Sequence, residues 1–146
     1  FEAGTRMPFI LSWPAAVKPA VSNALVCQID LLASFGQLLH QKIPAGDAPD
    51  SENMLNAFLG KTLVGRNVLV KQGTSSLTIT KDNWKYIEPN GGTPLSKLVN
   101  IETGNSTEPQ LYDLKKDPSE KKNLATQYPG KVKELESQLK NIKTKY

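Results

Sequence analysis

Reactive side chains are scarce in this sequence. It has a single cysteine, Cys27, and a single histidine, His40, in 146 residues. One cysteine excludes an internal disulfide and a cysteine-based metal site. These two residues form no Cys-His pair or Ser-His-Asp triad, and no glycine-rich phosphate loop appears. The residues alone therefore offer no catalytic constellation.

Long apolar runs are also absent. Every apolar run falls far short of the roughly 18 residues that a membrane-spanning helix needs, so no membrane partner is expected. The sequence starts at Phe1 without an initiator methionine or a secretory leader. We therefore expect a fragment or a processed chain of a longer protein.

Arginine is rare although the chain is basic. Lysine and arginine number 18 against 14 acids, which gives a net charge of +4. The lysines of segments 115–122 and 131–145 alternate with acids. Nucleic-acid sites favour arginine and exposed aromatic residues. The pattern favours a solvated basic face, and no nucleic-acid partner is expected.

The first 66 residues predict short elements between turns. The apolar run 9–13, bounded by Pro8 and Pro14, predicts a buried strand. From residue 24 the apolar spacing is helical, with two alternatives: one helix over 23–40, or a strand over 25–28 and a helix from Leu31. The second is favoured, with Asp30 as the N-cap. The turn-rich region 41–66, with a short helix that ends at Gly60, is the expected domain boundary.

The remainder predicts an α+β fold. β-forming residues at 67–72, 77–80, 84–87 and 111–114 predict a four-stranded antiparallel sheet, with a hairpin at 81–83. A helical turn is expected within 120–125. An apolar stripe at three- and four-residue spacing predicts an amphipathic C-terminal helix near 130–143, which would cover the sheet.

Five strings, taken in order, resemble the sulfatase family. FEAGTRMPFILSWPAAVKP resembles its aromatic-Glu-Gly-Gly-x-Arg-x-Pro run, with Ala3 in place of one glycine. The second string, QIDLLASF, resembles the family's Asp-Leu-x-Pro-Thr helix start. The third, APDSENMLNAFLG, resembles a segment that ends in a short helix. The fourth, ITKDNWKYIEP, resembles the family's Trp-Lys hairpin. LYDLKKDPSEKKNLA matches the Leu-Tyr-Asp-Leu-x-x-Asp-Pro-x-Glu-x-x-Asn-Leu-Ala signature at every fixed position.

The resemblance implies the C-terminal portion of an alkaline-phosphatase-like enzyme. Residues 1–60 would end its large α/β catalytic domain with a strand-helix segment, and residues 61–146 would form its C-terminal subdomain. Such enzymes hydrolyse aryl or carbohydrate sulfates with a formylglycine nucleophile and a divalent cation, usually Ca²⁺. The resemblance also implies a periplasmic or secreted location.

The catalytic groups of that family are expected upstream of Phe1. Cys27 lacks the proline and arginine of the formylglycine motif. Asp82-Asn83 occupies a predicted hairpin turn and is not expected to bind metal. We therefore expect the isolated chain to bind no cation and to be inactive. The alternative is a stand-alone carbohydrate- or protein-binding module.

Two groups of residues are candidate site residues by this resemblance. Glu2, Gly4 and Arg6 would support the active-site loop, or Glu2 and Arg6 would form a structural ion pair. Gln72, Thr74 and Ser75, followed by Ser76, would form a substrate-specificity loop, with an ordinary solvated turn as the alternative. Trp84 and Tyr86 could stack on a sugar, but packing against the C-terminal helix is favoured.

The predicted strand at 9–13 leads to a testable expectation. In a truncated protein, this strand would lack its neighbours, and unpaired edges recruit other chains. We expect self-association through residues 8–13, which Leu11→Lys should reduce without unfolding the C-terminal sheet. Light scattering measures this, and a monomer at high concentration would contradict it.

Overall fold

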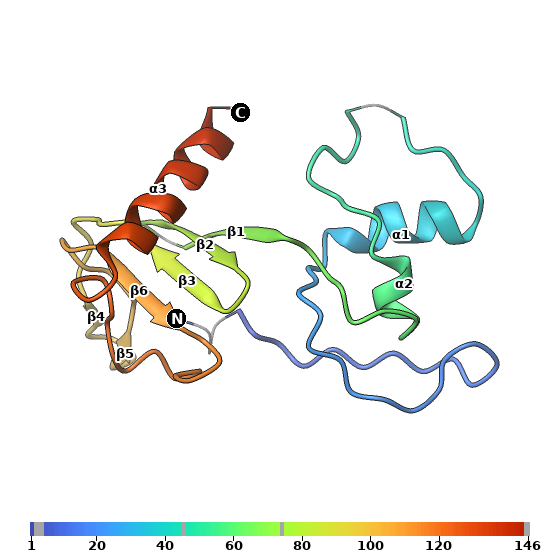
Figure 1. Cartoon of the computed structure of the whole chain (residues 1–146), viewed down its shortest axis with the longest axis horizontal. Coiled ribbons are helices and arrows are strands. Elements are labelled where there is room, and N and C mark those ends of the chain that lie inside the picture. The colour runs from blue at the N-terminus through green and yellow to red at the C-terminus, as the bar shows by residue number, and fades with distance from the viewer. Residues whose placement is uncertain (2–4, 45, 74, 145–146) are drawn as a thin grey trace. The chain divides into compact units, whose positions relative to one another are not determined.

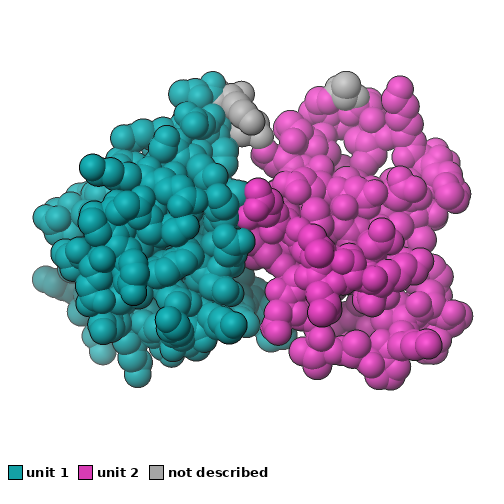
Figure 2. Space-filling view, in the orientation of Figure 1, with its two compact units in different colours: residues 1–8, 68–146 teal, residues 9–67 magenta. Residues whose placement is uncertain are grey.

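The chain forms two compact units. The structure is a computed structural model that describes residues 1, 5–44, 46–73 and 75–144. Unit 1 combines Phe1–Pro8 with Val68–Tyr146, and unit 2 contains Phe9–Asn67 (Figure 2). The division predicted at residue 60 concerns the domains of a longer protein and stays a prediction. No helix in the described ranges is both long and apolar enough to cross a membrane.

Unit 1 contains the predicted four-stranded antiparallel sheet. Its strands are β1 (Val68–Gln72), β2 (Leu77–Lys81), β3 (Trp84–Ile87) and β6 (Gln110–Asp113), in the order β1-β2-β3-β6 (Figure 1). The β2–β3 connection is the predicted tight hairpin, in which Asp82 takes a left-handed φ of 54°. β6 ends one residue before the predicted end, because the Leu114 N–H turns to donate to the Asn83 carbonyl.

Helix α3 (Pro129–Lys143) packs on one face of the sheet through β2 and β3, as the sequence predicts (Figure 1). Pro129 stands at its first turn, where a missing N–H costs nothing. Tyr86 lies within the core, and Trp84 packs on its margin against Tyr128. The buried core between sheet and helix comprises Ile79, Tyr86, Leu111, Ala125, Leu135 and Leu139.

The opposite face of the sheet is also buried, but it is partly polar. Leu69, Thr80, Lys85 and Tyr112 stand side by side across the four strands in the ladder register. All four are buried. The Lys85 Nζ lies 2.7 Å from the Glu120 Oε1, and each side chain is only 1% exposed. The Tyr112 hydroxyl donates to the Gln110 Oε1 at 2.8 Å.

The segment after β6 forms turns rather than the predicted helical turn at 120–125. Asp113 accepts from the Lys115 N–H, and Asp117 accepts from the Lys122 N–H at 2.8 Å. Asn123 accepts from the Leu111 N–H at 3.0 Å, so this segment returns along the outer edge of β6. These side chains satisfy backbone groups that a helix would otherwise pair, which is why the segment needs no helix.

A two-stranded ribbon lies inside the region predicted as the loop 88–109. It consists of β4 (Leu95–Ser96) and β5 (Ile101–Glu102), which pair antiparallel. Each strand has only two residues, too few to show an alternating pattern in the sequence.

Unit 2 contains helices α1 (Asp30–Leu38) and α2 (Leu55–Phe58), and Gly60 follows α2 with a left-handed φ of 66°, as expected. The strands predicted at 9–13 and 25–28 are wrong, because both segments lack regular secondary structure. A strand needs a partner for its backbone groups, and the described part of this unit offers two helices. Ile10 is 90% exposed. The self-association through residues 8–13 stays a prediction, now based on exposed apolar side chains.

The N-cap predicted at Asp30 is also wrong, and so is the single helix over 23–40. Ile29 precedes the first turn without a side-chain cap, and Asp30 is the first helical residue. Its carboxylate accepts instead from the Cys27 N–H at 2.9 Å and the Glu52 N–H at 3.0 Å. The side chain therefore links α1 to two other segments rather than closing the following turn.

The Lys85–Glu120 pair predicts a stability effect. Lys85→Met should lower the free energy of unfolding by about 3–5 kcal/mol, because it leaves a buried carboxylate without the charge opposite it. Urea unfolding measures this loss. The double variant Lys85→Met/Glu120→Met should recover most of it, since neither charge of this pair is then present. A double variant no more stable than Lys85→Met would show that the charge pair is not the cause.

Candidate functional site

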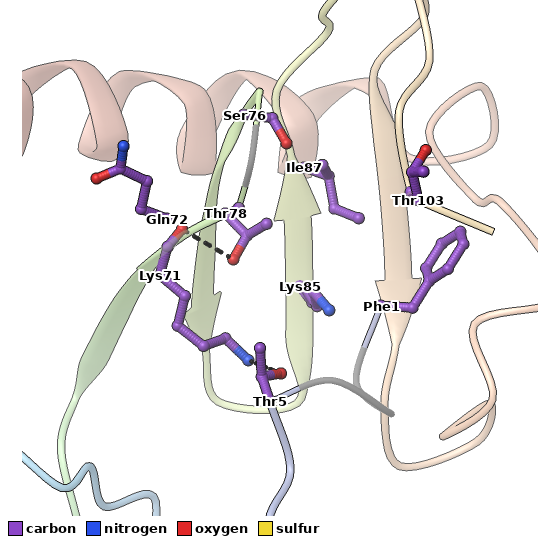
Figure 3. A pocket seen from close by; sticks show the side chains of 11 residues that line it. Phe1, Thr5, Lys71, Gln72, Ser76, Thr78, Lys85, Ile87 and Thr103 are labelled. Atoms are coloured by element: carbon purple, nitrogen blue, oxygen red, sulfur yellow. Dashed lines mark hydrogen bonds between the residues drawn. The ribbon is translucent and has the colours of Figure 1, made fainter. Parts of the chain in front are cut away.

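A small hollow of about 60 Å³ lies on the polar face of the sheet. Strands β1 to β3, the N-terminal segment and the loop after β5 all contribute to its wall. Figure 3 shows Lys85 and Ile87 on the strand at its centre, with Phe1 and Thr103 to one side. Gly104 has a left-handed φ of 77°, and a Cβ added there would lie 3.5 Å from the Phe1 nitrogen. The hollow is thus built from segments distant in sequence.

The polar groups around the hollow are cationic and hydroxylic. The Lys71 Nζ donates to the Thr5 Oγ1 at 3.0 Å, and the Thr78 hydroxyl donates to the Lys71 carbonyl (Figure 3). Lys85 also lines the hollow, while its ammonium group pairs with Glu120. A volume of this size holds a few water molecules or one polar substituent of a larger ligand. The donors favour a substituent with acceptor oxygens.

The predicted specificity loop lies at the rim of this hollow. The Gly73 N–H donates to the Ser76 carbonyl at 2.8 Å and closes the β1–β2 connection. Gln72 is among the lining residues, but its side chain extends away from the others (Figure 3). Ser75 is exposed at the tip of the connection. Thr74 lies outside the described residues, and the specificity role of this loop stays a prediction.

The predicted active-site-loop residues are described only in part. Arg6 is exposed in the N-terminal segment. Glu2 and Gly4 lie outside the described residues, so the Glu2–Arg6 pair and the support of an active-site loop stay predictions. Met7 and Pro8, which continue the same motif, are exposed as well.

Sequence reasoning missed an ionic cluster in unit 2. The fully buried Asp30 carboxylate accepts from the Arg66 guanidinium, with Nε to Oδ2 at 2.8 Å. Arg66 also donates to the Glu52 carboxylate at 2.9 Å and to the Asp50 carbonyl. Burial would raise the pKa of Asp30, but the hydrogen bonds from Arg66, Glu52 and Cys27 outweigh it and lower that pKa. The carboxylate therefore stays ionised and holds three segments together.

Gly65 lets Arg66 reach this position. A Cβ at Gly65 would come within 2.3 Å of the Leu25 carbonyl oxygen, so only glycine fits the close approach of the two backbones. The Arg66 N–H donates to the same carbonyl at 2.7 Å. The adjacent Gly65 and Arg66 are the sequence feature that could have indicated this cluster, but they belong to no periodic pattern.

The described residues do not fit the cation that the sulfatase resemblance implies. They contain no group of three or more His, Cys, Asp or Glu side chains that could hold a metal ion. Asp82 and Asn83 form the β2–β3 turn, as predicted. Burial raises the pKa of Tyr86 and of Tyr112 to about 12, so neither phenol is an acid or base near neutral pH.

Comparison with known proteins gives long matches. The chain is 48% identical to the N-acetylgalactosamine-6-O-sulfatase of Bacteroides thetaiotaomicron, over 99% of the chain and 29% of that protein. It is 46% identical to arylsulfatase K of Xenopus laevis, over 97% of the chain and 26% of that protein. No protein-family profile matches.

A solved structure from work on glycosaminoglycan metabolism by B. thetaiotaomicron superposes with a TM-score of 0.94 at 49% identity. It covers 98% of this chain and 30% of the solved one. The fold is thus that of a C-terminal subdomain within a longer chain. The chain belongs to the sulfatase family and corresponds to the C-terminal part of its members, spanning about 30% of the length of these relatives.

The Asp30 cluster predicts a pH dependence. Because folding lowers the pKa of Asp30, its stabilising contribution is complete above the ordinary value of 3.8 and is lost as the pH falls below it. Asp30→Asn should cost at least about 2 kcal/mol at neutral pH. The difference between the two proteins should shrink below that value, and urea unfolding over a pH series measures it. A constant difference down to the lowest pH would contradict the assignment.

Proposed function

We propose that this chain is the C-terminal part of an enzyme that hydrolyses carbohydrate sulfate esters. The observation that carries the proposal is the 48% identity to an N-acetylgalactosamine-6-O-sulfatase along almost the whole chain. The proposed substrate class is accordingly a sulfated amino sugar or a related sulfated carbohydrate, and the products are the free hydroxyl and inorganic sulfate. An aryl sulfate serves as a convenient model substrate in the assay.

The catalytic groups belong, in this proposal, to the part of the protein upstream of Phe1. They are a formylglycine nucleophile and a calcium ion with its carboxylate ligands. Within the described part of the chain, no residues fit the ion, so we assign no step of the reaction to them. We also propose the periplasmic or secreted location that the family resemblance implies.

The role proposed for this chain is binding of the sugar part of the substrate. The hollow beside Lys71 and Thr5 offers an ammonium group and hydroxyls to acceptor oxygens. The neighbouring β1–β2 connection ends in exposed polar residues that can contact a ligand. A rigid sheet beneath the loop gives such contacts a fixed geometry.

An activity assay on two proteins tests the proposal. In the graft, this chain replaces the matched segment of the B. thetaiotaomicron sulfatase. The graft should hydrolyse a 6-O-sulfated N-acetylgalactosamine within roughly tenfold of the parent rate, about 1.4 kcal/mol of transition-state stabilisation. The isolated chain, with calcium added, should show no turnover of a chromogenic aryl sulfate above a buffer blank.

A matched control removes the nucleophile. The same graft, with the cysteine or serine precursor of formylglycine replaced by alanine, should be inactive. Turnover by the isolated chain would mean that the active site has been misplaced. A folded but inactive graft would favour the alternative of a stand-alone binding module.

A further inference from the structure

The turns after β6 expose their lysines to solvent. Lys115, Lys116, Lys121 and Lys122 are all exposed, and we name these four residues the turn lysines. The Lys116 side chain is 82% exposed, and its Nζ lies 3.7 Å from the Asp113 carboxylate. The other three form no ion pair with any residue that the structure describes. Their charges are therefore available to a ligand.

The acids between these lysines are occupied by the protein itself. The Glu120 side chain is 1% exposed, and Lys85 neutralises its charge at 2.7 Å. Asp113 is buried, and Asp117 accepts from the Lys122 N–H at 2.8 Å. Since Glu120 is already paired, Asp113 and Asp117 offset only half of the charge of the turn lysines. Lysines and acids alternate in the sequence, but the exposed surface of this segment is positive.

Hydrogen bonds hold the two pairs of turn lysines close together. Asp117 directly follows Lys116, and its carboxylate accepts from the Lys122 N–H. Asn123 directly follows Lys122 and accepts from the Leu111 N–H at 3.0 Å, which fixes this end of the segment on β6. The backbones of both lysine pairs thus belong to one closed segment with a fixed position on the sheet.

The lysines of helix α3 differ from the turn lysines in their pairing. Three of the four form ion pairs, which are Lys131 with Glu134 at 2.7 Å, Lys140 with Glu136 at 2.9 Å and Lys143 with Glu88 at 2.8 Å. An ammonium group beside a carboxylate attracts another anion less strongly. The turn lysines are therefore the stronger anion-binding surface.

We propose that the turn lysines form a docking surface for a sulfated polysaccharide chain, away from the site of ester hydrolysis. The choice of this partner rests on the proposed function. Sulfate groups repeat a negative charge along such a chain, and clustered lysines attract a polyanion through the release of its counterions. Nucleic acid is the weaker partner, because the segment 115–122 contains no arginine and no aromatic residue. A chain held at this surface has a raised local concentration near the enzyme.

Binding of chondroitin 6-sulfate, a polymer that contains 6-O-sulfated N-acetylgalactosamine, tests the proposal. In the turn variant, all four turn lysines are replaced by glutamine. At about 50 mM salt the turn variant should bind the polymer at least about tenfold more weakly than the unmodified chain, because counterion release is lost at four positions. The difference should narrow at about 0.2 M salt. Titration calorimetry measures both affinities.

A control variant carries the same change in net charge elsewhere. Its replaced lysines are also exposed and form no ion pair with a described residue, and its substitutions are Lys18→Gln, Lys42→Gln, Lys61→Gln and Lys97→Gln. It should lose less than about threefold in affinity, since salt screens charges that do not touch the polymer. Equal losses in the two variants would assign the binding to net charge alone and overturn the proposal.

An arginine variant separates charge from folding. Replacing all four turn lysines by arginine keeps the charges, so this variant should bind at least as tightly as the unmodified chain. Weaker binding by a folded arginine variant would overturn the proposal. This comparison stays decisive if the glutamine variant folds poorly.

Two further ligands define the partner. Unsulfated chondroitin should bind more weakly than the sulfated polymer, and equal affinities would overturn the role of sulfate. Loss of duplex DNA binding in the turn variant, without loss of chondroitin 6-sulfate binding, would assign the surface to nucleic acid and overturn the proposal. So would a failure of the unmodified chain to bind chondroitin 6-sulfate. No turnover is measured, so an inactive graft would count against the proposed function and leave this binding result unchanged.

Discussion

The pairing of Lys85 with Glu120 is the constraint on which the C-terminal unit depends. The four-stranded sheet is buried on both faces, and α3 supplies apolar side chains to only one of them. The other face carries an ammonium group at its centre, which cannot stay buried without an opposite charge. Glu120 supplies that charge from a left-handed backbone position with φ of 53°. The turns after β6 therefore place this carboxylate opposite the Lys85 ammonium group.

The signature that carries the family resemblance is explained by this arrangement. Its fixed polar residues Asp113, Asp117 and Asn123 accept hydrogen bonds from backbone N–H groups of the same segment, and Glu120 pairs with Lys85. None of these side chains faces the hollow. LYDLKKDPSEKKNLA thus contains side chains that hold together the turns after β6.

The sheet and α3 could be predicted because their signals are local. Alternating apolar residues, a two-residue turn and a helical stripe each lie within a short window of sequence. Asp30 and Arg66 are separated by 36 positions, and neither stands in a periodic pattern, so their pairing could not be predicted.

Predicting the hollow requires the same kind of non-local information, since Phe1 and Thr103 both line it although they are far apart in the sequence. The strand predicted at residues 9–13 is wrong for a related reason. Their β-propensity is real, but a strand forms only where a partner strand pairs with it. The predicted loop at 72–76 lies at the rim of the hollow, but the hollow itself could not be predicted.

Asn123 also has a consequence for how the C-terminal unit folds. Its side-chain oxygen accepts from Leu111 and Ala125, its amide donates to the Pro109 carbonyl, and the next residue, Leu124, donates to the Leu111 carbonyl. All of these contacts close loops of fewer than about 15 residues, which is entropically inexpensive. The segment around Asn123 can therefore pack on the edge of β6 as soon as β6 forms, because both are close together in the sequence. Local closure of this kind shortens the time for which a strand edge is open to other chains during synthesis.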